Sequence, residues 1–305
     1  MLITVAICTR DRAESLDRTL RSLHEATVPD GLDWELVVVD NGSTDETAAV
    51  LGAWKADLPV SRILEPEPGL SRARNRAVDA ARGTHILWTD DDVCVDAAWL
   101  AEYARAFKAF PDDAFFGGPI RAHFEASPPA WLPRVLDRVP GAFAIRDLGS
   151  QALRLGPGND RLPFGANYAV RTPTQRRHRY DHALGMKPGP FVRGEEMAVF
   201  QSMLRNGESG RWVPEARVTH FIPTQRQNER YVRAFYRLDA ATRPGFGGRT
   251  GRLGLLMNAL RAEARFRVLR FTAPPERWIT ALVEACEAWG VRDRVTNDTR
   301  RIARD

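Results

Sequence analysis

Short apolar runs and amphipathic segments alternate through the first 110 residues, and this alternation restricts the fold more than any other feature of the sequence. Apolar runs of about four to eight residues are typical of buried strands, and apolar residues three or four positions apart are typical of helices. Strands that alternate with helices form right-handed βαβ units and a mostly parallel sheet. The sequence therefore predicts an α/β fold of the nucleotide-binding type, with helices flanking the sheet. The expected strands are Leu2 to Cys8, Glu35 to Val39, Pro59 to Leu64 and His85 to Thr89.

Two capping-box patterns mark expected helix starts. Asp11 and Glu14 stand three residues apart before a run of leucines, and Ser43 and Glu46 repeat that spacing. In a capping box the first side chain accepts a hydrogen bond from the backbone of the new helix. We therefore expect a helix to begin at each place, and a further helix from about Leu70 to Ala81.

The composition fits a chain with a sizeable core. Of its 305 residues, 44% are hydrophobic, which is enough for one large domain or for a domain with an appendage. No apolar run approaches the roughly 20 residues that a membrane span needs, and the first residues do not resemble a secretory signal. The three cysteines lie far apart, at Cys8, Cys94 and Cys286. We therefore expect neither a disulfide framework nor a zinc site, and a cytoplasmic location fits.

The charge is modestly basic, with a net value of +5, and nearly all of the cations are arginines. Arginine suits phosphate recognition because its planar fork binds two oxygens at once. A GC-rich genome would give the same bias. No nucleic-acid-binding motif accompanies the charge, so nucleic acid is not an expected partner.

Three consecutive aspartates, Asp90, Asp91 and Asp92, follow the apolar run that ends at Thr89. Open α/β sheets bind ligands at the carboxyl ends of their strands. Like charges this close repel one another, and a divalent cation such as Mg²⁺ or Mn²⁺ would neutralise them. Alternation along an extended segment predicts that Asp90 and Asp92 point the same way and Asp91 the opposite way. The alternative is an acidic turn that caps the next helix.

Two more charged residues lie near the same expected edge of the sheet. Asp40 ends the second strand, where it can accept a hydrogen bond from a nucleobase or hold the turn that follows. Arg74 shares a helix face with Leu70 and Ala77. An arginine on an apolar face needs an anionic partner, and either a ligand diphosphate or a carboxylate of this chain would serve.

Glu195 and Glu196 follow Gly194, at the start of a segment with helical spacing. On a helix Glu196 shares a face with Val199 and Phe200, which predicts that Glu196 is the inward carboxylate. Partial burial raises the pKa of a carboxyl and suits it to general base catalysis. The alternative is a pair of glutamates that stabilises the helix N-terminus.

His220 ends a strand-like run, where it is either a metal ligand or a structural hydrogen-bonding residue. With His220 added to the motifs above, the sequence resembles glycosyltransferase family 2, which has the Rossmann-like GT-A fold. The motifs that carry the resemblance are Val5 to Arg10, Val37 to Asp45, Gly69 to Asn75, Asp90 to Asp92, Gly165 to Asn167, Gly194 to Glu196, and His220.

The resemblance implies a role for each motif. Asp92 and His220 would bind Mn²⁺ or Mg²⁺, and Glu196 would be the catalytic base with Glu195 as its substitute. Glu196 stands where the family usually has aspartate. Thr9 and Asp40 would hold the nucleobase, and Asn167 belongs to a segment that lines the sugar pocket. The residues expected at the nucleotide-sugar donor are Thr9, Arg10, Asp40, Arg74, Asn75, Asp90, Asp91 and Asn167.

The implied activity is inverting transfer of a sugar from a nucleotide-diphosphate sugar, most simply a UDP-sugar, to an acceptor hydroxyl. The acceptor would be a glycan, a lipid-linked sugar or a small molecule in cell-surface glycan, polysaccharide or glycolipid synthesis. A sugar-phosphate nucleotidylyltransferase is a rival, but it needs a glycine-rich loop after the first strand, and Cys8 to Arg12 has none. A catalytically silent nucleotide-sugar-binding protein on the same scaffold is a second rival.

The expected organisation is a catalytic domain over residues 1–224 and a basic helical extension over 225–305, with Gly245 to Gly248 as a boundary before the tail. Within the first domain, residues 1–115 would bind the nucleotide and 116–224 the acceptor. The segment Gln227 to Tyr231 weakly resembles the Gln-x-x-Arg-Trp motif of processive synthases.

Basic and apolar residues alternate at helical spacing in the extension. A stripe of arginines is expected on one helix face, and the tail repeats the pattern with apolar residues opposite basic positions. Either the stripe is a solvated face or it meets a lipid diphosphate or an anionic membrane surface, which allows peripheral contact at the inner membrane face. These residues are Arg226, Arg230, Arg233 and Arg237 in the stripe, and Leu253, Leu256, Met257 and Leu260 in the tail.

Overall fold

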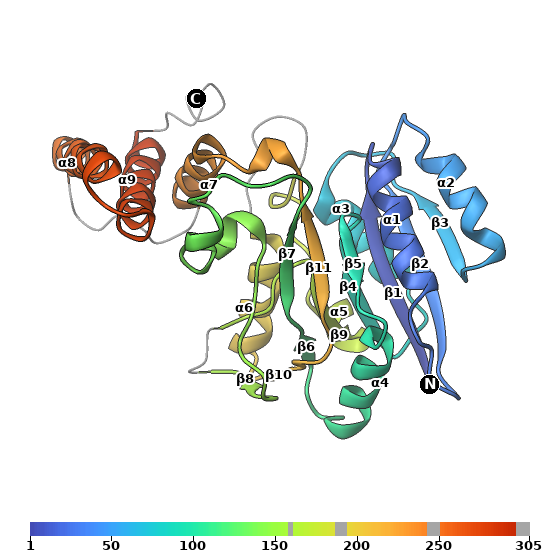
Figure 1. The fold of residues 1–305 in the computed structure, drawn as a ribbon. Coiled ribbons are helices and arrows are strands. Elements are labelled where there is room, and N and C mark those ends of the chain that lie inside the picture. Colours follow the sequence, from blue (N-terminus) through green and yellow to red (C-terminus); the bar gives the residue numbers. More distant parts are fainter. Residues whose placement is uncertain (158–160, 187–193, 243–250, 297–305) are drawn as a thin grey trace. The chain divides into compact units, whose positions relative to one another are not determined.

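A computed structural model describes residues 1–157, 161–186, 194–242 and 251–296. Its main feature is an eight-stranded sheet with the order β3-β2-β1-β4-β9-β6-β10-β8 (Figure 1). The first four strands in that order are parallel, which confirms the predicted α/β fold with a mostly parallel sheet. The strands are β1 (Leu2–Thr9), β2 (Asp33–Asp40), β3 (Val60–Leu64), β4 (His85–Thr89), β6 (Phe115–Gly117), β8 (Arg154–Leu155), β9 (Asn167–Arg171) and β10 (Gly210–Trp212).

A second sheet has three strands in the order β5-β11-β7. Only three residues lie between β4 and β5, so the three aspartates form the short connection between the two sheets. The strands are β5 (Val93–Val95), β7 (Ile120–Phe124) and β11 (Val218–Ile222).

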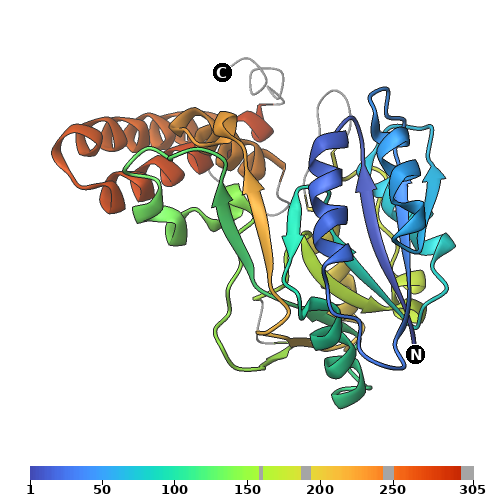
Figure 2. The same ribbon diagram turned by 45° about the vertical axis from the view of Figure 1, so that its right-hand side comes forward.

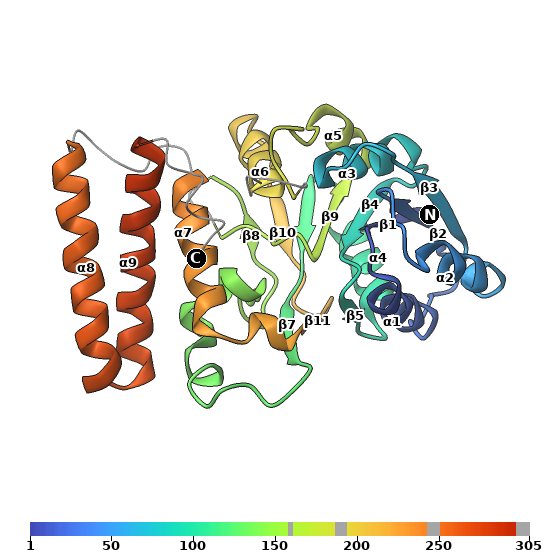
Figure 3. The same ribbon diagram turned by 90° about the horizontal axis from the view of Figure 1, so that it is seen from above.

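Helices cover both faces of the large sheet (Figure 3), and α1 and α2 lie in front of the blue strands in Figure 2. Side chains alternate across a strand, so Ile3, Val5 and Ile7 of β1 pack into a core with α1, α2 and α4. Ala6 points into a second core with α3 and α6. The helices on the two faces are α1 (Ala13–His24), α2 (Thr47–Ala53), the 3₁₀ turn η1 (Trp54–Ala56) and α4 (Trp99–Ala109), and then α3 (Leu70–Ala80), α5 (Thr172–Arg177) and α6 (Glu195–Arg205).

The predicted capping boxes are wrong, because the polar side chains in the loops after β1 and β2 bond to the opposite loop. Asp11 adopts a left-handed conformation (φ 51°) and accepts hydrogen bonds from the backbone and hydroxyl of Thr44. Ser43 accepts one from the backbone of Asp11. Asp45 in turn accepts one from the backbone of Ala13, the first residue of α1. A partner about 30 positions away therefore replaces the one expected three positions away.

The described residues divide into two compact units. The first contains residues 1–123, 144–157, 161–186 and 194–221, and the second contains 124–143, 222–242 and 251–296. The change from one unit to the other at 221 and 222 lies close to the expected boundary at 224 and 225. Segment 124–143, which the sequence assigned to the acceptor half, belongs to the second unit. Gly245 to Gly248 lies outside the described residues.

The second unit is helical, as expected for the C-terminal region. Helices α7 and α8 each pack against α9, which lies between them (Figure 3). Along the described ranges, no helix is both long and apolar enough to cross a membrane. The elements are α7 (Glu229–Thr242), α8 (Arg252–Thr272) and α9 (Pro275–Val295), with the 3₁₀ turns η2 (Pro133–Arg138), η3 (Pro140–Phe143) and η4 (Thr224–Arg226).

Candidate active site

The three aspartates do not alternate as predicted. Strand β4 ends at Thr89 and the chain turns, so strand geometry no longer applies to them. Asp91 and Asp92 both approach Arg12, with oxygen-to-nitrogen distances of 3.2 Å and 2.6 Å. Asp90 points elsewhere: its side chain is 40% exposed and lies 3.9 Å from Arg74.

Strand pairing brings His220 to Asp92. His220 on β11 is the antiparallel partner of Val93 on β5, and the backbone of Phe221 donates to the carbonyl of Asp92. The His220 Nε2 atom consequently lies 3.5 Å from Asp92 Oδ2, and both side chains are buried. Two of the predicted metal ligands, 128 positions apart in the sequence, therefore meet at the end of β4.

The cluster has an uneven charge distribution. Burial raises the pKa of Asp91 to about 7, although Arg12 opposes the shift. Burial acts in the same direction on Asp92, but His220 and Arg12 outweigh it and hold the pKa of that carboxyl below its usual range. Asp92 is therefore the carboxylate of this cluster that is ionised at neutral pH.

Thr9 and Arg10, at the end of β1, differ in their surroundings. Thr9 is buried and donates its hydroxyl to Asp91 at 2.7 Å. Arg10 is about 39% exposed and pairs with Asp11 at 3.5 Å. Thr9 therefore orients a carboxylate of the cluster, whereas Arg10 extends toward solvent.

Arg12 is the residue that the sequence analysis missed. Its guanidinium is the cation shared by Asp91 and Asp92. The available signal was its position in the loop after β1, since parallel strands β1 and β4 are neighbours and end at the same edge. A cation at one strand end pairs readily with carboxylates at the next.

A second charged cluster surrounds Arg74. The arginine is 4% exposed and lies on the buried side of α3, as predicted. Its Nη1 atom is 2.7 Å from Glu195 Oε1 and 3.7 Å from Glu196 Oε2, and its Nη2 atom is 3.9 Å from Asp90 Oδ1. Its anionic partners are thus carboxylates of this chain, which was the second of the two alternatives.

The prediction that Glu196 is the more buried glutamate is wrong. The Glu195 side chain is 7% exposed and that of Glu196 is 21% exposed. Helix α6 begins at Glu195 after the left-handed Gly194, and the side chain at this first position follows its ion pair with Arg74 rather than the apolar stripe. Burial raises the pKa of Glu195 to about 7, the charge of Glu196 adds to the rise, and Arg74 opposes it.

Gly165 lies against both charged groups of this second cluster. A Cβ atom there would come within 3.0 Å of Arg74 Nη2 and 3.3 Å of Glu196 Oε1. Both distances are shorter than ordinary van der Waals contact. The glycine therefore leaves the space that these two side chains occupy.

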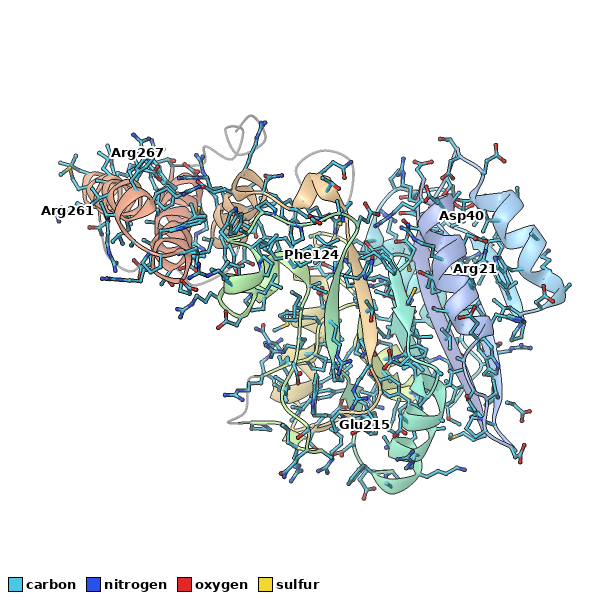
Figure 4. All side chains as sticks on the ribbon, in the orientation of Figure 1. Arg21, Asp40, Phe124, Glu215, Arg261 and Arg267 are labelled. Atoms are coloured by element: carbon cyan, nitrogen blue, oxygen red, sulfur yellow. The ribbon has the colours of Figure 1, made fainter. Side chains whose placement is uncertain are left out.

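Asp40 is the last residue of β2 (Figure 4). Its carboxylate is fully buried, accepts a hydrogen bond from the backbone of Ser43 and pairs with Arg62 at 2.6 Å. This geometry supports the turn-holding alternative. A contact between Asp40 and a nucleobase stays a prediction.

Two residues that were predicted to bind the nucleotide-sugar donor instead make hydrogen bonds within the protein. Asn167 is fully buried and makes four side-chain hydrogen bonds, to Trp99, Tyr103 and the carbonyls of Pro119 and Ala216. An amide side chain has two donor hydrogens and two acceptor lone pairs, so none is left for a sugar. Asn167 is therefore not part of the nucleotide-sugar site that we propose.

Asn75 likewise binds main chain. Its side chain donates to the carbonyl of Tyr180 and accepts from the backbone N–H of the same residue. This two-way bond ties α3 to the segment that follows α5. A donor contact of Asn75 stays a prediction.

Asp92 and His220 fit a divalent cation as a partial set of ligands. An ionised carboxylate and an imidazole that converge within 3.5 Å suit Mn²⁺. Over the described parts of the chain, no three His, Cys, Asp or Glu side chains are grouped so as to hold a metal ion. Any further ligands would come from water or from a bound phosphate.

The comparisons with known proteins agree on one family. The family described as "Glycosyl transferase family 2" matches residues 4–161. The succinoglycan biosynthesis protein ExoM of Rhizobium meliloti (strain 1021) is 30% identical over 228 residues, which cover 73% of this chain and 68% of that protein. A PGL/p-HBAD biosynthesis glycosyltransferase of Mycobacterium bovis (strain BCG / Pasteur 1173P2) is 33% identical over 123 residues, 39% of this chain and 47% of that protein.

Solved structures share the fold at low identity. S. aureus TarS 1–349 in complex with UDP-GlcNAc has a TM-score of 0.55 and 15% identity, with 98% of this chain and 92% of that chain covered. The mannosyltransferase PcManGT from Pyrobaculum calidifontis, in complex with GDP-Man and Mn²⁺, has a TM-score of 0.53 and 18% identity, with 98% and 75% covered. At such identities the likeness is one of fold.

Proposed function

This chain belongs to glycosyl transferase family 2, and from that premise we propose that it transfers a sugar, with inversion, from a UDP-sugar to an acceptor hydroxyl. The family and the fold make the chain a glycosyltransferase with the GT-A fold. The particular donor, the stereochemical course and the residue roles below are the proposal.

One observation carries the proposal: Asp90 connects the two charged clusters. It is the neighbour in sequence of Asp91 and Asp92, and its carboxylate lies 3.9 Å from Arg74, which in turn lies 3.7 Å from Glu196. A donor whose diphosphate lies at the aspartates would therefore have its sugar close to Glu196. Sugar transfer needs a base near the sugar, where it can take the proton of the acceptor hydroxyl that attacks the anomeric carbon.

We assign the base role to Glu196. Glu195 is buried and committed to Arg74, whereas Glu196 is partly exposed and can receive the proton of an incoming hydroxyl. A general base must come within hydrogen-bonding reach of the proton it removes. Inverting transfer needs one such base and no covalent intermediate, so the pair divides into Glu196 as the base and Glu195 as the residue that positions Arg74.

Asp92 and His220 are the residues that would hold a divalent cation. Such a cation, when bound, stabilises the negative charge that develops on the departing diphosphate. Thr9 and Arg12 orient the neighbouring carboxylates through the contacts described above. The presence of Mn²⁺ with GDP-Man in the PcManGT structure supports this part of the proposal.

The acceptor belongs to cell-surface glycan, polysaccharide or glycolipid synthesis in this proposal. Two relatives support it, since one is described by succinoglycan biosynthesis and the other by PGL/p-HBAD biosynthesis. The TarS complexes with UDP and UDP-GlcNAc support a uridine nucleotide.

A thermal-shift screen of nucleotide sugars with Mn²⁺ tests the donor. A ligand that binds only the folded state raises the apparent stability, by about 2.7 kcal/mol at a concentration 100 times its Kd. We expect a UDP-sugar to raise the Tm most, and the same ligand to be hydrolysed slowly by the enzyme. A larger shift with a GDP-sugar would replace the uridine assignment, and binding without any hydrolysis or transfer would indicate a silent binding protein.

A further inference from the structure

Helix α8 carries an exposed apolar stripe. Among the described residues nine large apolar side chains are exposed, and five of them lie on this one helix. Phe271 is 90% exposed and Leu253 is 73% exposed, values that are costly for an unpartnered surface because large apolar groups favour burial. The five residues are Leu253, Met257, Leu260, Val268 and Phe271.

The stripe lies opposite the side of α8 that folds against the protein. A helix turns about 100° per residue, which places all five side chains within a sector about 80° wide. Leu255, Ala259 and Phe266 occupy the other side and are buried, and Phe266 meets Trp278 of α9 edge-to-face. Helix α8 therefore has one apolar face for its own fold and a second that faces outward.

Arginines border the outward stripe. Helix α8 contains five arginines and one acidic residue, Glu263. Arg261 and Arg267, labelled in Figure 4, lie on opposite edges of the stripe by the same helical geometry and are exposed. Glu263 bonds to Arg233 of α7 and to Arg267. Glu284 pairs with Arg265 and Glu229 pairs with Arg270, so carboxylates of the second unit neutralise part of this charge.

The arginine stripe expected on α7 is not available for such a role. Arg233 pairs with Glu263 at 3.1 Å and Arg237 pairs with Asp293 at 2.8 Å. Both contacts lie within the second unit and hold its helices together. The surface that combines exposed apolar side chains with arginines is thus on α8, not on α7.

We propose that α8 docks flat on an anionic lipid bilayer, with the stripe inserted at the headgroup boundary and its arginines against lipid phosphates. An interfacial helix combines an apolar face with flanking Lys or Arg, and the stripe from Leu253 to Phe271 is about 27 Å long. A second copy of this chain fits less well, because a two-fold contact between stripes would bring Arg261 and Arg267 against the same arginines. The docking goes beyond the proposed sugar transfer and does not depend on it.

Flotation of the full-length protein with vesicles tests the proposal. One set of vesicles contains phosphatidylcholine only, and a second contains about one third phosphatidylglycerol. We expect binding to the second set, at least ten-fold stronger than to the first and weakened by salt. Equal binding to both sets, or none to either, would overturn the proposal.

Matched variants test whether vesicle binding depends on the α8 stripe or on any exposed apolar side chain. Leu260→Glu with Phe271→Glu should abolish flotation, while Val28→Glu, at an exposed apolar position in the first unit, should leave it unchanged. Arg261→Gln with Arg267→Gln should weaken binding on the order of 25-fold, because each arginine contributes about five-fold near an anionic surface. Arg105→Gln, on α4, is the control for charge.

Two further measurements check that the variants are folded and that the protein is a monomer. Circular dichroism should show the same helix content in all variants, because the substituted side chains are exposed. Light scattering of the wild type should give a monomer. A dimer that Leu260→Glu with Phe271→Glu dissociates would assign the stripe to a second copy and overturn the lipid proposal. Sugar transfer to a water-soluble acceptor should be equal in all of these variants, so a failure of the proposed activity would be seen separately.

Discussion

Arg74 and Glu195 form a buried ion pair, with 2.7 Å between Nη1 and Oε1, although 121 positions separate them in the sequence. The pair joins α3 to the first residue of α6. Loss of one partner from a buried ion pair leaves the other charge without compensation. Glu195 therefore fixes the position of Arg74, and Arg74 fixes the carboxylate next to it, Glu196.

The first prediction tests which of the two glutamates, Glu195 or Glu196, is the catalytic base. Glu196→Gln should lower the rate of sugar transfer by about 10²- to 10⁴-fold, the usual contribution of a general base, because glutamine cannot accept the acceptor proton. Affinity for the donor, measured by calorimetry, should change by less than two-fold. Glu215→Gln, at an exposed position (Figure 4), should behave as the wild type. Wild-type turnover in the Glu196 variant would refute the assignment.

A second prediction follows from the raised pKa of Glu195, about 7 against 4.5 in an unperturbed glutamate. The folded protein holds this proton more tightly than the unfolded chain does, so protonation stabilises the fold fully below about pH 4.5. That contribution is lost as the pH rises toward 7. Between those values the free energy of unfolding should fall more in the wild type than in Glu195→Gln, by on the order of 2–3 kcal/mol.

Urea unfolding at pH 4.5, 5.5 and 7 measures this difference. The glutamine variant keeps the shape of the side chain and removes its titration, so the comparison isolates one carboxyl. Identical pH slopes for the two proteins would contradict the raised pKa of Glu195.

The third prediction uses the tight surroundings of Gly165. Gly165→Ala adds a Cβ within 3.0 Å of Arg74 Nη2 and 3.3 Å of Glu196 Oε1, so both side chains must shift by a few tenths of an ångström. We expect a fall in kcat of about two- to ten-fold, since a displacement of about 1 Å in a catalytic group can reduce rates by about 100-fold and the shift here is smaller.

Gly52→Ala is the matched control for this change. Gly52 lies in α2 with no atom within 4 Å of its added Cβ. Alanine is favoured over glycine inside a helix by about 0.5–1 kcal/mol, so this variant should be slightly more stable and equally active. Equal activity in the Gly165 variant would show that the charged cluster tolerates the shift.

The strands and the fold could be predicted because their signals are local. An apolar run such as His85–Thr89 contains all the information that makes it a buried strand. The side-chain details that failed depend on distant partners. Asp11 contacts Thr44, Asp91 contacts Arg12, and Glu195 contacts Arg74, and no spacing within a single segment shows such pairs. The meeting of Asp92 with His220 was expected only through the family resemblance.

The last prediction concerns Arg12, whose guanidinium pairs with both Asp91 and Asp92. Arg12→Gln should leave the two carboxylates in mutual repulsion and lower the Tm by a few degrees. Mn²⁺ should then restore more stability in the variant than it adds to the wild type, because a divalent cation can replace the missing charge. Thermal unfolding with EDTA and with 1 mM Mn²⁺ measures both effects. The double variant Arg12→Gln with His220→Ala should lose most of the Mn²⁺ response, since one of the two proposed ligands is gone. A Tm that Mn²⁺ leaves unchanged in the Arg12 variant would mean that Asp92 and His220 do not bind the cation.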